Sequence, residues 1–425
     1  MNILDLAKKR ILVLDGAMGT QIHALALPEE AWDGNLGCSE YLNLVAPDKI
    51  RGIHENYLAA GADIVESNTF GGSANTLAEY DLQARTEEIN RIAASLARAA
   101  ADAFSTKDRP RFVAGSIGPG TKLATLGQTT YDVLYEGYRR QIEGLLDGGV
   151  DLLLIETCQD LLQVKAALAA ARDAMAHARS VPIYVSVTIE QTGTLLTGTD
   201  MPGCVTVLSA FDVDVLGMNC ATGPLAMRPH LEVLSQRWPG LVGVYPNAGI
   251  PMPSALGVRF PEQPDEFSQS LRRFASEMRI HFVGGCCGTT PDHIRALADA
   301  VACIAPLDRP VERVEAIGSL FSSVDIRQEP PPLFFGERAN ATGSKAFRDA
   351  MLAGRHDAAF EILCEQEEHG SHAADLSVAY AGQDERAHMD VMVARAAREC
   401  RLPIMIDTNY ADVAELALKR YAGRA

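Results

Sequence analysis

The chain has 425 residues, of which 47% are hydrophobic and 22% charged, as in an ordinary globular protein. Its 38 basic and 55 acidic residues give a net charge of −17, which argues against nucleic acid or an anionic membrane as a partner. The sequence shows no apolar run of the roughly 20 residues that span a bilayer, and we expect no signal peptide. Nine scattered cysteines favour a reduced, cytoplasmic protein with metal-binding thiols over a disulfide scaffold.

Short apolar runs recur along roughly the first 300 residues, and each ends in small or polar residues. Helical segments rich in Ala, Leu, Glu and Arg lie between them. Runs that are apolar on both faces indicate strands buried on both sides, as in a parallel sheet. We therefore predict an α/β fold in which a closed (β/α)₈ TIM barrel is favoured over a doubly wound open sheet. The eight predicted strands lie at 11–16, 62–68, 111–119, 151–160, 182–189, 214–223, 241–249 and 280–288.

Polar side chains gather at the C-terminal ends of these strands, which form the mouth of a barrel where chemistry takes place. Asp15 and Glu156 suit a substrate ammonium group, although ordinary capping of the following turns explains either one equally well. The glycine-rich turn that begins at Gly16 offers backbone N–H groups to a carboxylate. The candidate substrate-binding residues are Asp15, Gly16, Glu66, Ser116, Glu156, Asn219 and Asn247.

Three glycine-flanked cysteines, Cys220, Cys286 and Cys287, end the sixth and eighth predicted strands. Adjacent cysteines reach one metal only where the backbone turns, and the surrounding glycines permit a turn. Three thiolates with one open position describe a catalytic zinc site, because thiolates select zinc over magnesium or calcium. Such a site suits deprotonation of a substrate thiol and alkyl transfer to sulfur. The alternative is that Cys220 is a core thiol and the Cys-Cys pair is incidental.

The C-terminal part has a different organisation. Residues 304–332 contain five prolines and little periodicity, which indicates a linker lying over the barrel surface. The strand–helix rhythm then resumes for about three β/α units, including an amphipathic segment over 345–368. Three units do not close a barrel, so we expect an incomplete second β/α domain that is part of a larger domain or needs a partner. The predicted domains are 1–303, 304–332 and 333–425.

Motifs throughout residues 1–303 resemble the homocysteine S-methyltransferase family. This resemblance implies a (β/α)₈ barrel in which Cys220, Cys286 and Cys287 bind zinc, and zinc binds the thiolate of L-homocysteine. It also implies that Asp15 and Glu156 contact the substrate amino group. The motifs are DGAMGT (15–20), ESNTFGG (66–72), GSIGP (115–119), ETCQD (156–160), GMNCATGP (217–224), YPNAG (245–249) and GGCCGTTPDHI (284–294).

The tail is similar to the start of the pterin-binding barrel of cobalamin-dependent methionine synthases. FGERANATGSKAF (335–347), HAADLSV (372–378) and PIMIDTN (403–409) look like its first three strands. The resemblance implies pterin contacts at Asn340, Asp375 and Asp407, in a folate site that this chain leaves incomplete. Ser377 departs from the asparagine that many members carry there.

Together the two resemblances imply zinc-dependent activation of the homocysteine thiol. Methylcobalamin, held by another module or chain, is the implied methyl donor, and methionine is the product. One alternative is a stand-alone methyltransferase that uses betaine or S-methylmethionine, although such an enzyme has no use for a pterin-like tail. A second alternative is a non-catalytic barrel that binds zinc or a thiol.

Overall fold

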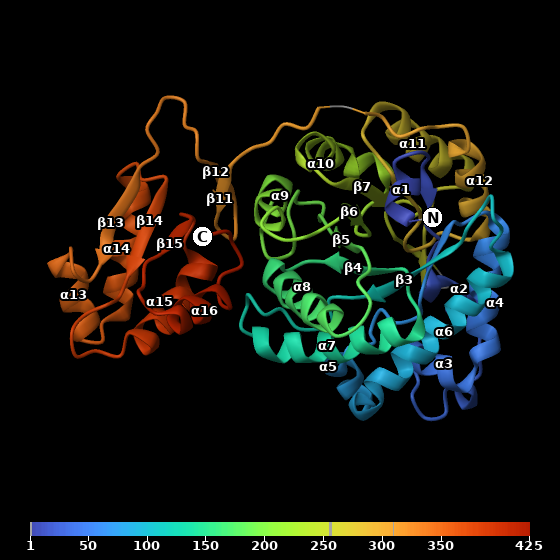
Figure 1. The fold of residues 1–425 in the computed structure, drawn as a ribbon, viewed down its shortest axis with the longest axis horizontal. Coiled ribbons are helices and arrows are strands. Elements are labelled where there is room, and N and C mark those ends of the chain that lie inside the picture. The colour runs from blue at the N-terminus through green and yellow to red at the C-terminus, as the bar shows by residue number, and fades with distance from the viewer. Residues whose placement is uncertain (1, 255–256, 309) are drawn as a thin grey trace.

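The structure, a computed structural model, describes residues 2–254, 257–308 and 310–425. A large barrel and a smaller C-terminal unit lie side by side, and an extended segment connects them (Figure 1). The barrel contains an eight-stranded parallel sheet, and the smaller unit contains a three-stranded parallel sheet.

The eight barrel strands pair in the order in which they follow one another along the chain. A parallel bridge between Leu14 and Ile64 links the first strand to the second and completes the ring. The predicted TIM-barrel fold is therefore confirmed, and the doubly wound alternative is excluded by the sequential order. Each strand lies within its predicted run: β1 (Leu12–Val13), β2 (Ile64–Glu66), β3 (Phe112–Ile117), β4 (Leu152–Cys158), β5 (Ile183–Val187), β6 (Val215–Asn219), β7 (Leu241–Tyr245) and β10 (Phe282–Val283).

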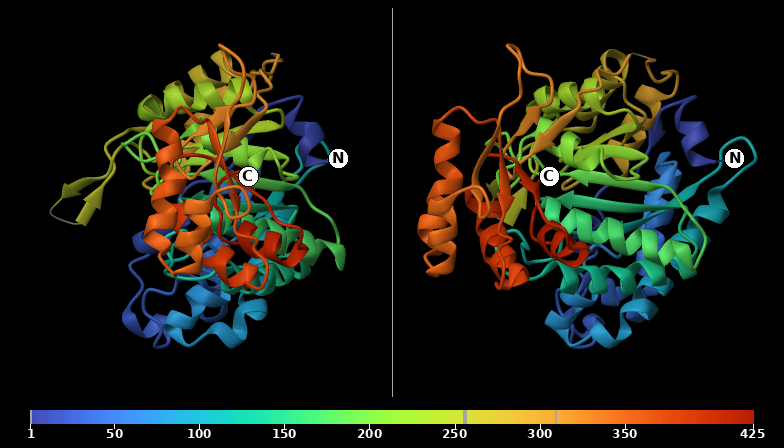
Figure 2. Two further views of the ribbon diagram at one scale, coloured as in Figure 1. Left: turned by 90° about the vertical axis from the view of Figure 1, so that its left-hand side faces the viewer. Right: turned by 60° about the vertical axis from the view of Figure 1, so that its left-hand side comes forward.

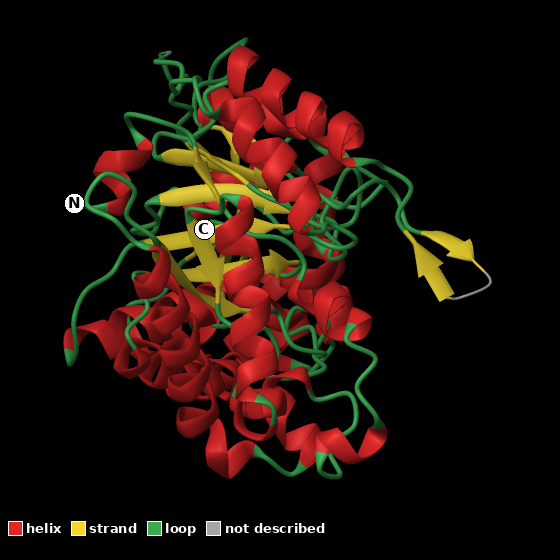
Figure 3. Cartoon of the chain, turned by 90° about the vertical axis from the view of Figure 1, so that its right-hand side faces the viewer, coloured by secondary structure: helices red, strands yellow, loops and turns green. Residues whose placement is uncertain are grey.

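Helices surround the sheet, and each strand is followed by one of them (Figure 3). Side chains of Thr130, Asp160 and Asp200 cap three of these helices by accepting hydrogen bonds from backbone N–H groups of the first turn. None of the helices in the described ranges combines the length and the apolarity that crossing a bilayer requires. The surrounding helices are α4 (Pro47–Ala60), α6 (Thr86–Phe104), α7 (Tyr131–Gly148), α8 (Leu161–Ala176), α9 (Met201–Leu208), α10 (Pro224–Arg237), α11 (Pro264–Glu277) and α12 (Pro291–Val301).

The interior of the barrel is packed with side chains and is not a pore. Tyr184 on β5 is fully buried there, beside Tyr245 and Phe282. Gly217 and Gly243 make room for its ring, because a Cβ atom on either would collide with the Tyr184 hydroxyl. The short helix α1 (Ile3–Ala7) contributes buried apolar side chains to the same interior cluster.

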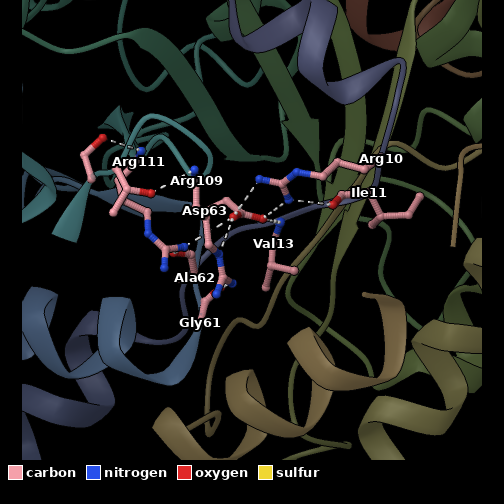
Figure 4. A network of polar contacts seen from close by, with 10 residues as sticks. Arg10, Ile11, Val13, Gly61, Ala62, Asp63, Arg109 and Arg111 are labelled. Carbon is pink, nitrogen blue, oxygen red and sulfur yellow. Dashed lines mark hydrogen bonds and ion pairs between the residues drawn. The ribbon is translucent and has the colours of Figure 1, made fainter. Parts of the chain in front are cut away.

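Opposite the mouth, one buried carboxylate ties together the beginnings of three strands (Figure 4). Asp63, just before β2, accepts hydrogen bonds from Arg10 at 2.7 and 3.0 Å, from the Val13 amide at 3.1 Å and from Arg111 at 3.3 Å. Arg109 lies 3.6 Å away as a third guanidinium partner. Because Val13 is on β1 and Arg111 precedes β3, Asp63 joins the neighbouring strands at this end of the barrel.

Two antiparallel hairpins depart from the barrel pattern. The first, β8 (Met252–Ser254) with β9 (Gly257–Arg259), projects away from the barrel after β7 (Figures 2 and 3). The second, β11 (Ala316–Gly318) with β12 (Ser323–Asp325), lies within the segment predicted as a linker. The sequence did not predict this second hairpin, which packs against α9 and buries Ala316 and Leu320.

The C-terminal unit has three parallel strands, β13 (Phe335–Asn340), β14 (Ala373–Ser377) and β15 (Ile404–Ile406), as the sequence predicted. Its apolar cluster, which includes Phe347, Leu363, Leu376 and Met389, gives the unit a core of its own. The amphipathic segment 345–368 forms two helices, because the chain turns at Gly354 with φ +65°. The helices of the unit are α13 (Lys345–Leu352), α14 (His356–Glu368), α15 (Glu385–Glu399) and α16 (Ala411–Leu418).

Residues 421–424, named here the clasp, join the C-terminal unit to the barrel. The buried Lys165 ammonium of α8 donates to the carbonyl oxygens of Tyr421 at 2.8 Å and Gly423 at 2.6 Å. The Tyr421 hydroxyl donates to the Gly318 carbonyl at 3.0 Å, and Gly318 also forms an antiparallel bridge with Arg424. The clasp therefore connects the barrel, the β11–β12 hairpin and the C-terminal unit. The domain limits at 303 and 332 stay a prediction.

Candidate metal and substrate site

A cavity of about 260 Å³ opens at the C-terminal ends of the barrel strands. Most of the residues predicted for substrate and metal line it, although they are spread over the whole barrel sequence. The predicted residues in its wall are Gly16, Glu66, Ser116, Glu156, Cys220, Cys286 and Cys287.

The three cysteine sulfurs form one cluster at this cavity, and all lie within 4.8 Å of one another. Cys220 follows β6 directly, with φ +62°, and Ala221 follows with φ +50°. Left-handed backbone at non-glycine residues costs of order 1–3 kcal/mol each and persists where the surroundings enforce it. The backbone therefore sharply reverses at Cys220 and presents its sulfur to the other two.

A tight turn brings the adjacent cysteines to the same side. The Cys286 amide donates to Pro246 O at 2.8 Å, and the Cys286 carbonyl accepts from the Thr289 hydroxyl at 2.7 Å. Gly288 has φ +80°, which a side chain would disfavour, and a Cβ on Gly285 would lie 2.5 Å from the Thr289 hydroxyl. The glycines around the pair are thus required by the turn that makes a shared site possible.

The pKa shifts of the three thiols indicate that the cluster needs a cation before all three can ionise. Hydrogen bonds from the Cys286 and Cys287 thiols lower the pKa of Cys220, while hydrogen bonding to Cys220 raises the pKa of Cys286 and of Cys287. One thiolate is therefore stable here, and a second or third needs a cation. Asn247 adds a buried side-chain oxygen without a hydrogen-bond partner. Three sulfurs and an unsatisfied acceptor fit a thiolate-preferring metal such as zinc.

Buried carboxylates occupy the other side of the cavity. Glu156 accepts hydrogen bonds from Ser116 Oγ at 2.5 Å and from Tyr245 Oη at 3.5 Å. Burial raises the pKa of Glu156 to about 7, although the Ser116 hydrogen bond opposes that rise. Burial also raises the pKa of Glu66, with repulsion by Glu156 and Asp15 adding to it, and Glu66 Oε1 is buried without a partner. A cationic group of a ligand would satisfy this cluster.

Three predicted residues, Asp15, Asn219 and Asn247, lie outside the cavity wall, and the first two support the site from behind it. The Asp15 carboxylate accepts from the Glu66 amide at 3.2 and 3.1 Å, and it does not line the cavity. Asn219 is fully buried and also lies outside the wall. The geometry thus places both residues in contact with other site residues, and their predicted contact with substrate stays untested.

Several cavity residues were missed in the sequence. Glu40, in the 3₁₀ helix η2 (Ser39–Tyr41) before α3 (Leu42–Val45), is buried and accepts from the Gly71 amide at 2.6 Å. Thr157 lines the cavity with φ +57°, which is unusual for a β-branched residue. The sequence did not identify Glu40 as a site residue, because it is far from any predicted strand end. Thr157 directly follows the predicted Glu156, but a positive φ at threonine is invisible in the sequence.

In the C-terminal unit, two of the three predicted pterin contacts meet. Asn340 Nδ2 donates to Asp375 Oδ2 at 2.9 Å, and the other Asp375 oxygen is buried without a partner. Burial raises the pKa of Asp375, and the charges of Asp407 and Glu337 contribute to that rise. Asp407, just after β15, is exposed.

Comparisons with known proteins also separate the barrel from the C-terminal unit. Residues 12–301 match the family model described as homocysteine S-methyltransferase, and residues 336–424 match the one described as pterin binding enzyme. The methionine synthase of Mycobacterium tuberculosis is 43% identical over 424 residues, and that of Mycobacterium leprae is 42% identical over 429. Both alignments cover 100% of this chain but 36% of the relative, so the chain spans about a third of their length.

A solved structure shares the barrel. The metallated form of the homocysteine methyltransferase MmuM from Escherichia coli superimposes with a TM-score of 0.57 at 25% identity. The superposition covers 70% of this chain and 99% of that protein. The similarity therefore extends over the barrel and not over the whole chain.

Proposed function

The chain belongs to the homocysteine S-methyltransferase family, and we propose that its barrel binds zinc and L-homocysteine and makes the homocysteine thiol a methyl acceptor. One observation carries this proposal: three sulfurs from distant parts of the sequence meet within 4.8 Å in the wall of the cavity at the mouth of the barrel. Methionine is then the product.

Cys220, Cys286 and Cys287 would hold the zinc, and the side chain of Asn247 hydrogen-bonds the Cys220 sulfur. Zinc bound there would keep a substrate thiol deprotonated at neutral pH, where a free thiol of pKa about 8.5 is mostly protonated. Three protein thiolates make the centre electron-rich, which preserves the nucleophilicity of a substrate sulfur. That charge balance favours alkyl transfer over hydrolysis.

The remaining cavity residues suit the amino acid part of homocysteine. Glu66 and Glu156 place buried carboxylates where a substrate ammonium group offsets their repulsion. The stretch from Gly16 to Thr20 lines the cavity as well, and its backbone N–H groups suit the substrate carboxylate. Ser116 and Tyr245 orient Glu156 by donating to its two oxygens.

For the methyl donor we propose methylcobalamin held by another module or chain. The pterin-binding match over 336–424 and the two methionine synthases favour this donor over betaine or S-methylmethionine. Asn340, Asp375 and Asp407 are the proposed pterin contacts. A reduced, cytoplasmic location agrees with free thiols throughout the described chain.

The test measures bound zinc first and then homocysteine-dependent demethylation of free methylcobalamin by the purified chain. We expect one zinc per chain and methionine formation. Parallel reactions with betaine and with S-methylmethionine identify a stand-alone enzyme if either of them is the faster donor. Zinc binding without turnover with any donor would contradict the proposal and support a non-catalytic thiol-binding barrel.

A further inference from the structure

Asn219, the last residue of β6, has every side-chain hydrogen-bonding atom engaged although no part of it is exposed. Its Oδ1 accepts from the Thr157 amide at 3.1 Å and from Ser186 Oγ at 2.7 Å. Its Nδ2 donates to Thr157 Oγ1 at 2.8 Å and to Cys286 Sγ at 3.8 Å. One amide group therefore connects β4, β5, β6 and the loop after β10.

The two bonds to Thr157 form a clamp on a strained residue. Thr157 has φ +57°, a conformation that costs of order 1–3 kcal/mol for a residue of its kind. Since Asn219 bonds both the backbone amide and the hydroxyl of Thr157, it offsets that cost and fixes the direction of the chain after β4. The residue before Thr157 is Glu156, so the clamp also fixes where β4 presents that carboxylate.

The other N–H of the Asn219 amide donates to the cysteine cluster. The distance of 3.8 Å from Nδ2 to Cys286 Sγ suits an N–H···S hydrogen bond. Asn219 also precedes Cys220, whose backbone has φ +62°. Amide donors to metal-ligating groups hold those groups in orientation, and their loss typically costs 10–100-fold in metal affinity.

We propose that Asn219 is a positioning residue that orients the Cys286 sulfur toward the metal while it holds Glu156 in place through Thr157. Asn219 does not line the cavity and acts through these neighbours, without touching the substrate. This inference rests on the proposed function, because it assumes that the three cysteines bind zinc.

The test compares Asn219→Asp and Asn219→Ser with a matched control. Asn219→Asp keeps the acceptor oxygen but loses both N–H donors, and Asn219→Ser is too short to reach Cys286. Asn90→Asp is the control, because Asn90 is equally buried, lies on α6 without lining the cavity, and donates to the Gly72 and Thr86 carbonyls at 2.7 Å each. Zinc affinity is measured by chelator competition, the cobalt-substituted spectrum by absorption, and the folded state of each metal-free variant by its thermal midpoint.

We expect both Asn219 variants to bind zinc about 10–100-fold more weakly and to show an altered sulfur-to-cobalt charge-transfer band. Asn90→Asp should lower the thermal midpoint without changing affinity or spectrum. Wild-type zinc affinity and an unchanged cobalt band in a folded Asn219 variant would overturn the inference. If the wild-type chain itself bound no zinc, the proposed function would fail and this inference with it, which the wild-type measurement reveals separately.

Discussion

Asp63, which is buried, and Glu66, which is half-buried, are carboxylates at opposite ends of the same short strand, and their surroundings differ sharply. Asp63 accepts four hydrogen bonds from two arginines and a backbone amide, and a third arginine lies near. Glu66 Oε1 has no partner, and its nearest charges are those of two further carboxylates. One end of β2 is therefore arranged for stability, whereas the other withholds stabilising contacts that a ligand can supply.

Strained backbone also marks the mouth end of the barrel. Three residues with left-handed backbone, Thr157, Cys220 and Ala221, stand at the mouth of the barrel. Such residues cost stability and persist where function requires a particular direction of a side chain. Substitutions at the two ends of the barrel should accordingly change different measured quantities.

The largest effect is expected for Cys286→Ser, which removes one of three sulfurs from the cluster. Zinc binding should be lost, with an affinity reduced by more than about 100-fold, because loss of an outer contact alone already costs 10–100-fold. The barrel should stay folded, since its core does not depend on the site. Zinc stoichiometry and circular dichroism check both points, with Cys303→Ser, an exposed cysteine, as control. Unfolding of the Cys286 variant would show instead that the site is structural.

Asp63→Asn should have the largest effect on stability. It leaves the buried Arg111 guanidinium without its carboxylate, and breaking a buried ion pair costs about 3–5 kcal/mol. Urea unfolding measures this cost, while zinc bound per folded chain should not change. The matched change Glu55→Gln, in the exposed pair with Arg51, should cost about 1 kcal/mol or less. Equal losses in the two variants would contradict the assigned role of Asp63.

Glu66→Gln should separate stability from binding. At pH 8 the substitution removes a carboxylate that has one buried oxygen without a partner, and it should raise the unfolding free energy by about 1 kcal/mol. The affinity for homocysteine should fall about tenfold, because a charge-assisted contact to the ammonium group is lost. Calorimetric titration and urea unfolding check the two effects. A destabilised variant with wild-type affinity would place Glu66 with Asp63 as a structural residue.

The last prediction concerns the pH dependence of stability. Burial raises the pKa of Glu156 to about 7 in the folded chain, from about 4.5 when unfolded. Between these values the folded state binds more protons than the unfolded state, so this residue's contribution to stability is present below about pH 4.5 and is lost as pH rises through about 7.

In the metal-free protein, the wild type should therefore lose stability relative to Glu156→Gln between about pH 4.5 and 7. Homocysteine binding should strengthen through the same range as Glu156 ionises. Unfolding curves measured at a series of pH values for both proteins test this expectation. A constant difference between them would show that Glu156 does not titrate in this window.

Much of the barrel could be predicted from the sequence, because its strands are short, apolar on both faces and followed by polar residues. Cys220, Cys286 and Cys287 stood out for their glycine neighbours, and the structure brings them together. The sequence did not reveal that Asn219 bonds Thr157 and Cys286, because the partners of a buried amide depend on the closure of the barrel. Glu40 was missed for the same reason, since only the folded loop brings it to the cavity.

The C-terminal unit shows a second limit of pattern reading. Its three strands followed from the periodic pattern, but the β11–β12 hairpin in the proline-rich segment did not. That hairpin is specified by pairing with Arg424 and by packing on α9, which are contacts between residues far apart in the sequence. Local sequence propensity cannot predict such contacts, because they depend on tertiary packing.

The clasp prevents the proline-rich segment from acting as a hinge between the barrel and the C-terminal unit. For the C-terminal sheet to rotate about it, Lys165 would have to release two carbonyl groups and strand pairing at Gly318 would have to open at the same moment. The barrel mouth and the C-terminal sheet therefore keep a fixed relative orientation while these contacts hold.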